Sequence, residues 1–496
     1  MHDTCRRQHL VVRFRRALKV SATVQVATFV LSFASVLVVS RLLTPEEIGI
    51  FSVSVALLGM AHIFREFGVG QYLVQAASVG REQIRAAFTV ALLCSWGIGL
   101  VVLAASIPMR MIYRHDGVQE VLALAALNFA VMPFGTPILS ILRRELQFDR
   151  IAWVTIVGAA VQTGVTIAAA YLGHSYLSMA YGTLAMQVTK VLMLNVIRPG
   201  ETFVWPSTSG VRDVLRFGSL STGAIVTNNL GSAAPDMIFG RTLGFADVAY
   251  YSRGVGMQNM LIEKIHEAVR SVYFPIFASE LRAGAKGAEL YAQTAGNLVA
   301  VTIPALVVLA VLANPLIPFV FGDQWAVSAP IASILCLYQV LVAPYALYQL
   351  SLIAAGKVGS QFKAELVIQA VRVLVLLSSV WLDLQQVVTL LIIAYATEAL
   401  VSQMALRKAF GLSFRALLGV SWKAYAIALA AASGPLVVSN LTAWDRHHTG
   451  DQLSILLLGG FAALAGWFAG VHALGHPLKL EIHRIVQRLI PTKAAR

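Results

Sequence analysis

Four charged side chains lie within stretches that are otherwise apolar, and they form two pairs along the sequence. Asp236 and Arg253 flank one predicted turn at nearly equal separations from it, and Arg372 and Glu398 lie on opposite sides of Gln385 and equally far from it. If these stretches are membrane helices, the two members of each pair lie at similar depth. An ionised group at mid-depth costs about 2.5–3.5 kcal/mol, so each of the four requires a reason.

Two interpretations of these charges stay open at the level of sequence. In the structural interpretation, the pairs are ion pairs that neutralise each other and hold neighbouring helices together. In the functional interpretation, they line a polar cavity and separate during a transport cycle. Arg253 and Arg372 would then attract an anionic substrate, and Asp236 and Glu398 would titrate or bind a coupling cation.

Uncharged polar side chains follow helical spacing in two further stretches. In the first stretch they are Ser21, Gln25, Thr28, Ser32 and Ser35, and in the second they are Ser221, Asn228 and Ser232, followed by Asp236. Residues three and four apart share one face of a helix. Close packing of small residues between helices would explain such faces. The alternative is a face turned to a polar cavity, with Gln25, Thr28, Asn228 and Ser232 as candidate lining residues.

The two polar faces belong to a repeated helical hairpin. Residues 21–60 align with residues 221–260 without a gap, and 9 of the 40 pairs are identical. The pattern Arg–x–Leu occurs at the turn in both copies, at Arg41 and Arg241. Internal repeats of this kind are typical of transporter folds.

The composition is that of a membrane protein. Hydrophobic residues make up 58% of the chain and charged residues 12%, and the mean hydropathy is +0.74; soluble domains carry about 25% charged residues. A membrane helix needs about 20 apolar residues. Fourteen stretches meet or approach this length, near 18–41, 47–64, 86–108, 119–142, 151–172, 175–197, 214–240, 246–262, 290–313, 327–354, 364–382, 385–406, 420–440 and 452–474.

Positive charge is concentrated on one side of these predicted spans. Of the 38 Lys and Arg residues, 30 lie in the two tails and the loops on the side of the N-terminus, and 5 lie in the opposite turns. The positive-inside rule therefore predicts that both termini are cytoplasmic. The net charge of +14 follows from this topology and not from binding to nucleic acid.

The spans group into two lobes of six and a final pair. Residues 198–217 contain two Pro, two Gly and several charges, as expected of a cytoplasmic connector. We therefore predict an all-α integral membrane protein with about 14 transmembrane helices. Its parts are an N-terminal lobe at 1–197, a connector and second lobe at 198–408, and an accessory helix pair with a basic tail at 409–496. The two six-helix lobes are expected to be parallel repeats.

A basic loop on the predicted cytoplasmic side carries Arg143, Arg144 and Arg150. Its first role is to anchor the topology. A second interpretation is contact with a phosphate or lipid headgroup, since Arg binds phosphate through two parallel hydrogen bonds. Gln147–Phe148 in this loop matches Gln361–Phe362 in the second half of the chain.

Several sequence motifs resemble one known family. They are GVGQYLVQ at 68–75, ILRRELQFDRIAW at 141–153, LRFGSLSTGAIVTNNL at 215–230, YFPIFA at 273–278 and VFGDQW at 320–325. In this order and spacing they resemble the Wzx-type polysaccharide flippases of the multidrug/oligosaccharidyl-lipid/polysaccharide exporter superfamily, in particular the colanic-acid-type exporters.

The resemblance implies a flippase that moves an undecaprenyl-diphosphate-linked oligosaccharide by alternating access across the bacterial inner membrane, for exopolysaccharide, capsule or O-antigen synthesis. Arg253 and Arg372 would attract its diphosphate. The implied partners are this lipid-linked substrate, the bilayer and, as a further candidate, a polysaccharide polymerase.

Two other function classes stay open. A drug or metabolite exporter of the same superfamily would share the fold, because fold does not determine cargo. A membrane polysaccharide polymerase is disfavoured because the predicted outer turns are short. No phosphate-binding loop of the G-x-x-x-x-G-K-[ST] type occurs, and Cys5, Cys94 and Cys336 match no metal-site spacing. We therefore expect no enzymatic activity and no cofactor.

Overall fold

The computed structural model describes residues 2–66, 73, 80–199, 231, 233–441 and 449–479. All regular structure in these residues is helical. The chain divides into two compact units, residues 1–249 (unit 1) and residues 250–496 (unit 2). The predicted all-α membrane class is confirmed.

Ten helices in the described ranges are long and apolar enough to cross a membrane. They coincide with ten of the fourteen predicted spans. Of the other four, 47–64, 246–262 and 364–382 lie largely in helices that do not meet the same criterion, and most of 214–240 lies outside the described residues. The count of fourteen stays a prediction.

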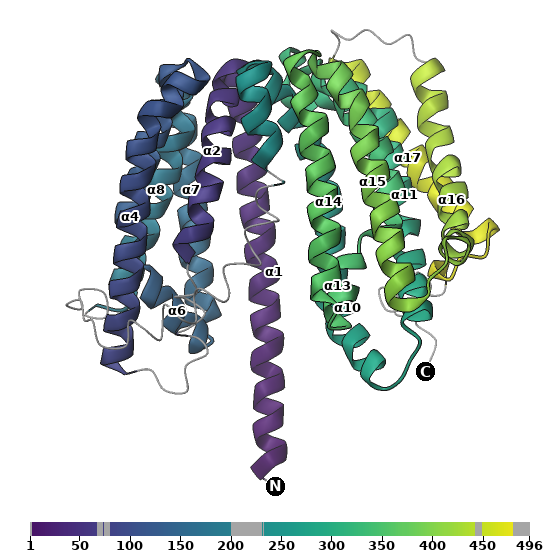
Figure 1. Ribbon diagram of the computed structural model, residues 1–496, viewed down its shortest axis with the longest axis horizontal. Helices are drawn as coiled ribbons and strands as arrows, with labels where there is room; N and C mark the ends of the chain where they lie inside the picture. Colours follow the sequence, from purple (N-terminus) through teal and green to yellow (C-terminus); the bar gives the residue numbers. More distant parts are fainter. Residues whose placement is uncertain are drawn as a thin grey trace, which may run out of the picture. The chain divides into compact units, whose positions relative to one another are not determined.

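Unit 1 is built of long helices that run side by side (Figure 1). α7 packs on α8 and α1, and α4 packs on α5. The elements are α1 (His2–Leu42), α2 (Pro45–Glu66), α4 (Arg81–Tyr113), α5 (Asp116–Val131), η1 (Met132–Phe134), α6 (Thr136–Arg144), α7 (Phe148–Tyr171), α8 (Leu177–Ile197), the helical segment 233–242 and the first turn of α10 (Phe245–Arg282).

Unit 2 contains the rest of α10 and the helices that follow it. α11 lies against α12, α16 and α17, and α14 lies against α15. The elements are α11 (Gly287–Phe321), η2 (Asp323–Trp325), α12 (Ser328–Val342), η3 (Ala343–Tyr345), α13 (Tyr348–Ala354), α14 (Val358–Leu377), η4 (Ser378–Val380), α15 (Leu384–Phe410), α16 (Phe414–Leu441) and α17 (Thr449–Ala473).

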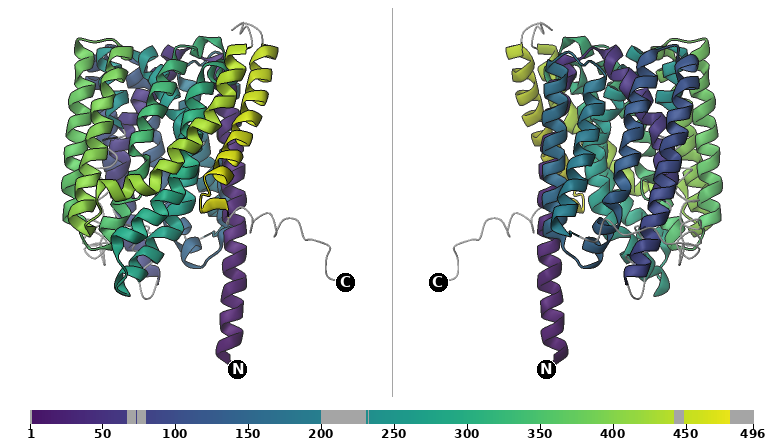
Figure 2. Two further views of the ribbon diagram at one scale, coloured as in Figure 1. Left: turned by 90° about the vertical axis from the view of Figure 1, so that its right-hand side faces the viewer. Right: turned by 90° about the vertical axis from the view of Figure 1, so that its left-hand side faces the viewer.

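α1 is longer than a membrane crossing requires. Its 41 residues correspond to about 60 Å of helix, whereas the hydrocarbon core is about 30 Å thick. The basic N-terminal half of α1 extends past the ends of the neighbouring helices of unit 1 (Figure 2). A membrane can therefore contain only the apolar C-terminal half of this helix.

The predicted hairpin repeat is confirmed at its turn. α1 ends at Leu42 and α2 begins at Pro45; at the aligned positions of the second copy, the helix ends at Thr242 and α10 begins at Phe245. In the first copy, Thr44 and Glu47 form a capping box, because the Glu47 carboxylate accepts from the backbone N–H of Thr44 at 2.7 Å.

A second repeated feature is a helix broken by proline. α5 and α6 are separated by a 3₁₀ turn that contains Pro133, and α12 and α13 are separated by one that contains Pro344. Proline lacks the N–H that would continue the ladder, so the helix breaks there. Each broken helix continues into a short helix and then a tight turn.

The turns after α6 and α13 are equivalent in their hydrogen bonds. The N–H of Gln147 bonds to the carbonyl of Leu142, and the N–H of Lys357 bonds to that of Leu352. This is a Schellman turn, in which the preceding residue is left-handed, with φ +57° at Leu146 and +70° at Gly356. In the structure, Gln147 therefore corresponds to Lys357. The sequence comparison had paired Gln147–Phe148 with Gln361–Phe362, which lies about one helical turn too far along the chain.

The accessory helices α16 and α17 pack on each other and on α11 through small residues. A Cβ on Gly466 would overlap the backbone carbonyl of Ala430, and a Cβ on Gly434 would overlap Ala462. Small residues let helix backbones approach closely in membranes. The division into parts at 1–197, 198–408 and 409–496 stays a prediction.

Substitution of Gly466 by Ala should destabilise the packing of α17 on α16. The added methyl group has no space, and such overpacking costs about 1–3 kcal/mol. Gly460→Ala on the same helix is the matched control, because a Cβ there meets no atom within 4 Å. The apparent Tm of the detergent-purified variants measures the difference; equal Tm values would contradict the close approach.

Candidate functional site

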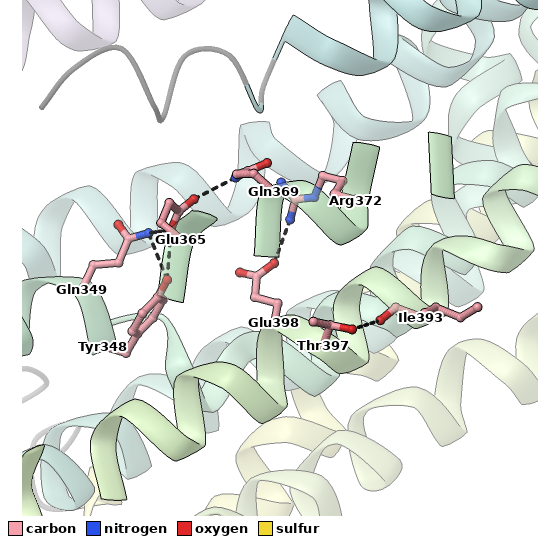
Figure 3. Close-up of polar contacts among 8 residues, drawn as sticks. All are labelled: Tyr348, Gln349, Glu365, Gln369, Arg372, Ile393, Thr397 and Glu398. Carbon is pink, nitrogen blue, oxygen red and sulfur yellow. Dashed lines mark hydrogen bonds and ion pairs between the residues drawn. The ribbon is translucent and has the colours of Figure 1, made fainter. Parts of the chain in front are cut away.

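Arg372 and Glu398 form the ion pair that the sequence predicts. Arg372 on α14 and Glu398 on α15 face each other, with 2.7 Å between Nη2 and Oε2 (Figure 3). Their side chains are 24% and 21% exposed, so the pair is largely shielded but accessible at one edge. The equal spacing from the turn brings the two residues to one level, as expected for an antiparallel hairpin.

A buried carboxylate beside this pair was not among the predicted site residues. Glu365 is 5% exposed. Its Oε2 accepts from the Tyr348 hydroxyl at 3.0 Å and from Gln349 Nε2 at 2.8 Å, and its Oε1 accepts from Gln369 Nε2 at 2.7 Å (Figure 3). All three donors are neutral.

A signal for Glu365 exists in the sequence. Glu365, Gln369 and Arg372 follow steps of four and three and therefore share one face of α14. The sequence interpretation took only Arg372 from this face and did not consider Glu365. Tyr348 and Gln349 come from α13, whose position against α14 depends on the break at Pro344.

Arg253 is held by aromatic rings. Its guanidinium carbon lies 4.9 Å from the centre of the Trp325 ring and 5.2 Å from that of Phe321. These distances fit cation–π contacts. Its Nε is buried and has no hydrogen-bond partner among the described residues. Arg253 therefore has one donor atom that its described neighbours leave unsatisfied.

The remaining predicted cavity residues are only partly described. Asp236 is half-buried in the helical segment 233–242 of unit 1, and its pairing with Arg253 of unit 2 stays a prediction. Gln25 is exposed on α1, and the Thr28 hydroxyl donates to the carbonyl of Val24 at 2.8 Å. Asn228 and Ser232 lie outside the described residues.

The three arginines of the basic loop have different environments. Arg144 is half-buried and its Nη1 donates to the carbonyl of Leu73 at 3.0 Å, which ties the loop to the preceding segment. Arg143 and Arg150 are exposed. Glu145 between them pairs with Arg198. Arg143 and Arg150 are therefore open to solvent, whereas Arg144 has a structural contact; contact of this loop with a headgroup stays a prediction.

Within the described ranges, no group of three or more His, Cys, Asp or Glu residues is arranged to hold a metal ion. The charged groups of unit 2 described above are Arg253, Arg372, Glu365 and Glu398. Their part in binding an anionic substrate stays a prediction.

Comparison with known proteins places this arrangement in context. A family model described as "Polysaccharide biosynthesis protein" matches residues 38–330. The lipopolysaccharide biosynthesis protein WzxC of Escherichia coli (strain K12) is 22% identical over 332 residues, which are 65% of this chain and 66% of WzxC. The teichuronic acid biosynthesis protein TuaB of Bacillus subtilis (strain 168) is 22% identical over 57% of this chain and 59% of TuaB.

A solved structure shares the fold over most of the chain. It is the lipid II flippase MurJ in an inward closed conformation, with a TM-score of 0.69 and 13% sequence identity. The alignment covers 91% of this chain and 99% of that one. At this identity the likeness establishes the fold.

The matched regions span 66% or less of the length of WzxC and TuaB.

Removal of one member of the Arg372–Glu398 pair should destabilise the protein. Arg372→Leu leaves Glu398 shielded without its partner, and breaking such a pair costs about 3 kcal/mol. The double variant Arg372→Leu/Glu398→Leu should recover much of this loss, since neither charge is left alone. Thermal unfolding of the purified variants measures the coupling.

The exposed pair Lys286–Glu289 provides the control, because its side chains are 79% and 65% exposed. Lys286→Leu should change stability by less than about 1 kcal/mol. Additive losses in the Arg372/Glu398 double variant would contradict a coupled pair.

Proposed function

This chain belongs to the polysaccharide biosynthesis protein family, and from that premise we propose that it moves an undecaprenyl-diphosphate-linked oligosaccharide repeat unit across the cytoplasmic membrane. The glycan would pass from the cytoplasmic to the periplasmic leaflet by alternating access. The product would serve the synthesis of an exopolysaccharide, capsule or O-antigen. In this proposal the chain is a transporter without enzymatic activity and needs no cofactor.

The observation that carries the proposal is the agreement of two independent similarities. The family match over residues 38–330 concerns polysaccharide synthesis, and the shared fold over 91% of the chain is that of a lipid II flippase. WzxC and TuaB are likewise named for the synthesis of surface polymers. We infer from these names together that the substrate is a lipid-linked oligosaccharide.

The physical problem that such a protein solves is the transfer of a hydrophilic headgroup. Polar groups lose their hydrogen bonds to water in hydrocarbon, and each unpaired group costs several kcal/mol. A polar passage within the protein avoids this cost while the lipid tail stays in the bilayer. Duplicated helical units are a common means of exposing such a passage to one side at a time.

The charged groups of unit 2 suit the proposed substrate. Arg253 would hold one phosphate through its guanidinium, whose Nε has no partner among the described residues, with its ring contacts keeping the guanidinium in place. Arg372 would exchange its bond to Glu398 for a bond to phosphate. Asp236, Asn228, Ser232, Gln25 and Thr28 are proposed as further groups along the route.

The proposed location is the bacterial inner membrane, with both termini in the cytoplasm. The support for this orientation is the excess of Lys and Arg on the side of the N-terminus. Arg143 and Arg150 would then meet the diphosphate headgroup on the cytoplasmic side before entry. A polysaccharide polymerase would receive the product on the other side.

Deletion of the gene in its native bacterium should cause a diphosphate-linked oligosaccharide to accumulate on the cytoplasmic side. Surface polysaccharide should be lost, because its repeat units no longer reach the periplasm. Mass spectrometry of extracted lipids measures the intermediate, and complementation with the intact gene is the control. If the lipid intermediates are unchanged and the deletion strain becomes more sensitive to drugs, the proposed flippase function is wrong and the protein is a drug exporter.

Neutral substitutions of the two arginines should reduce transport. Arg253→Ala and Arg372→Ala each remove a phosphate contact, and a charge-assisted hydrogen bond of about 1.5–3 kcal/mol corresponds to at least about a tenfold loss. Arg253→Lys should retain part of the activity. Surface polysaccharide in the complemented deletion strain measures the effect at matched protein levels.

Lys286→Ala is the matched control, since this side chain is 79% exposed and pairs only along its own helix. It should restore polysaccharide fully. Full rescue by both arginine variants would exclude them from the substrate route.

A further inference from the structure

Lys190 is a charged side chain inside a membrane-spanning helix of unit 1, and the proposed substrate contacts leave it without a role. It lies on α8, seven residues before this helix ends at Ile197. α8 is long and apolar enough to cross a membrane over its whole length. A lysine within such a helix faces the interior of a bundle or a water-filled cavity, and it requires a partner there.

The side chain of Lys190 runs along α7 and into the membrane. A Cβ on Gly158 of α7 would lie 2.9 Å from Lys190 Cε, 3.0 Å from Lys190 Cγ and 3.4 Å from Met186 Cγ. Helical side chains lean toward the preceding turn of their own helix, so Lys190 extends toward Met186. Gly158 is ten residues, or about 15 Å of helix, past the start of α7 at Phe148. The ammonium group is therefore directed away from the headgroups beside Ile197.

No carboxylate neutralises Lys190 within the described residues. It takes part in none of the ion pairs there, and Asp236 in the segment 233–242 is not its partner. The elements that pack on α7 and α8 are α1, α2, α5, α6 and η1. In all of these helices, every Asp and Glu lies in the first two turns, except Glu66, which is the last residue of α2. None of these carboxylates therefore lies at the depth of Lys190.

The equivalent hairpin of unit 2 neutralises its charge internally. The two Schellman turns place α7 and α8 in correspondence with α14 and α15. In unit 2, Arg372 and Glu398 pair across this hairpin at 2.7 Å. Lys190 has no such partner among the described residues of unit 1, so its charge is open to an anion from outside the chain.

Two amide side chains lie on the same helix faces as this contact. Gln187 is three residues from Lys190 on α8, and Gln162 is four residues from Gly158 on α7. Both are half-buried, and neither side chain forms a hydrogen bond with another described residue. Amide N–H groups donate hydrogen bonds to oxyanions. One ammonium group and two amides thus form a polar patch on the α7–α8 hairpin.

This polar patch does not lie on the face that α8 turns to lipid. The lipid-exposed face of α8 is apolar, because Leu192 and Val196 are 61% and 80% exposed and lie one turn apart. Lys190 is two residues from Leu192 and therefore about 200° away around the helix. Polar groups are costly in hydrocarbon, so a patch of this kind belongs beside water.

We propose that Lys190, Gln187 and Gln162 form an anion-binding site on unit 1, which holds one carboxylate or phosphate group. The ammonium group supplies the positive charge and the amides donate hydrogen bonds. No covalent bond is made or broken. The site itself is argued from unit 1 alone, whereas its use rests on the proposed transport function: an acidic sugar or the diphosphate of the substrate would contact it during passage.

A reporter cysteine in the purified full-length protein measures the electrostatic potential beside Lys190. Met186→Cys, in a chain whose Cys5, Cys94 and Cys336 are replaced by Ala, places a thiol one turn away. Its rates of reaction with an anionic and a cationic methanethiosulfonate reagent are compared. Lys190→Gln should lower the ratio of the anionic to the cationic rate by about five- to tenfold, because one nearby unit charge is lost.

Two controls make this measurement decisive. Lys190→Arg keeps the charge and should keep the ratio, which separates loss of charge from a change in the fold. Leu192→Cys is the matched reporter on the lipid-exposed face of α8 and should react with neither reagent. The proposal is overturned if the Met186→Cys thiol reacts with neither reagent, or if Lys190→Gln leaves the ratio unchanged.

Protection of the same reporter identifies the anion. Inorganic diphosphate or glucuronate is added to the Met186→Cys protein, and a bound anion should slow the anionic reagent when Lys190 is present and not in Lys190→Gln. Protection by diphosphate assigns the site to a phosphate group, and protection by glucuronate assigns it to an acidic sugar. If neither anion protects the thiol, no anion-binding site exists at this position.

The complemented deletion strain separates this inference from the proposed function. Loss of surface polysaccharide with Lys190→Gln and its recovery with Lys190→Arg support both. A reporter ratio that responds to Lys190, in a protein whose deletion leaves lipid-linked intermediates unchanged, supports the anion site and refutes the flippase. Full surface polysaccharide with Lys190→Gln, in a strain that needs this protein to make it, overturns the contact with the substrate.

Discussion

The cost of a charge in a medium of low dielectric constant governs the polar groups of this protein. A membrane helix has no water with which to solvate an ionised side chain, so the protein itself must supply the partner. Arg372 has Glu398, Arg253 has the rings of Trp325 and Phe321, and Glu365 has three neutral donors. The three charged groups therefore differ in the kind of partner that the fold supplies.

Duplication explains how such groups are accommodated without loss of the fold. The hairpin turn occurs twice along the chain, and so does the broken helix with its Schellman turn. The backbone pattern of both features survives in two copies with different side chains. In unit 1 the second feature encloses an apolar contact, and in unit 2 it encloses the network of Glu365. The copy in unit 1 thus has the backbone pattern with apolar side chains, and the copy in unit 2 has the same pattern with a polar network.

This specialisation relates the family to the proposed mechanism. A carrier of a lipid-linked glycan needs cations that attract a diphosphate and then release it. In the proposed mechanism, an arginine that is paired with one carboxylate and has a second carboxylate nearby meets that need, because its affinity for an anion follows the charge of its neighbours. Arg253, which has aromatic neighbours, would bind phosphate without such control.

The sequence by itself determined the membrane class, the hairpin turn and the pairing of Arg372 with Glu398, since helical period and turn position place residues at one depth. Only the tertiary structure decided the partners of Arg253 and the burial of Glu365. Trp325 is separated from Arg253 along the chain by the whole of α11, and Tyr348 reaches Glu365 only because Pro344 breaks its helix. Such contacts depend on how each helix is rotated about its axis. Packing between helices sets this rotation, and the periodicity of the sequence within one helix does not specify it.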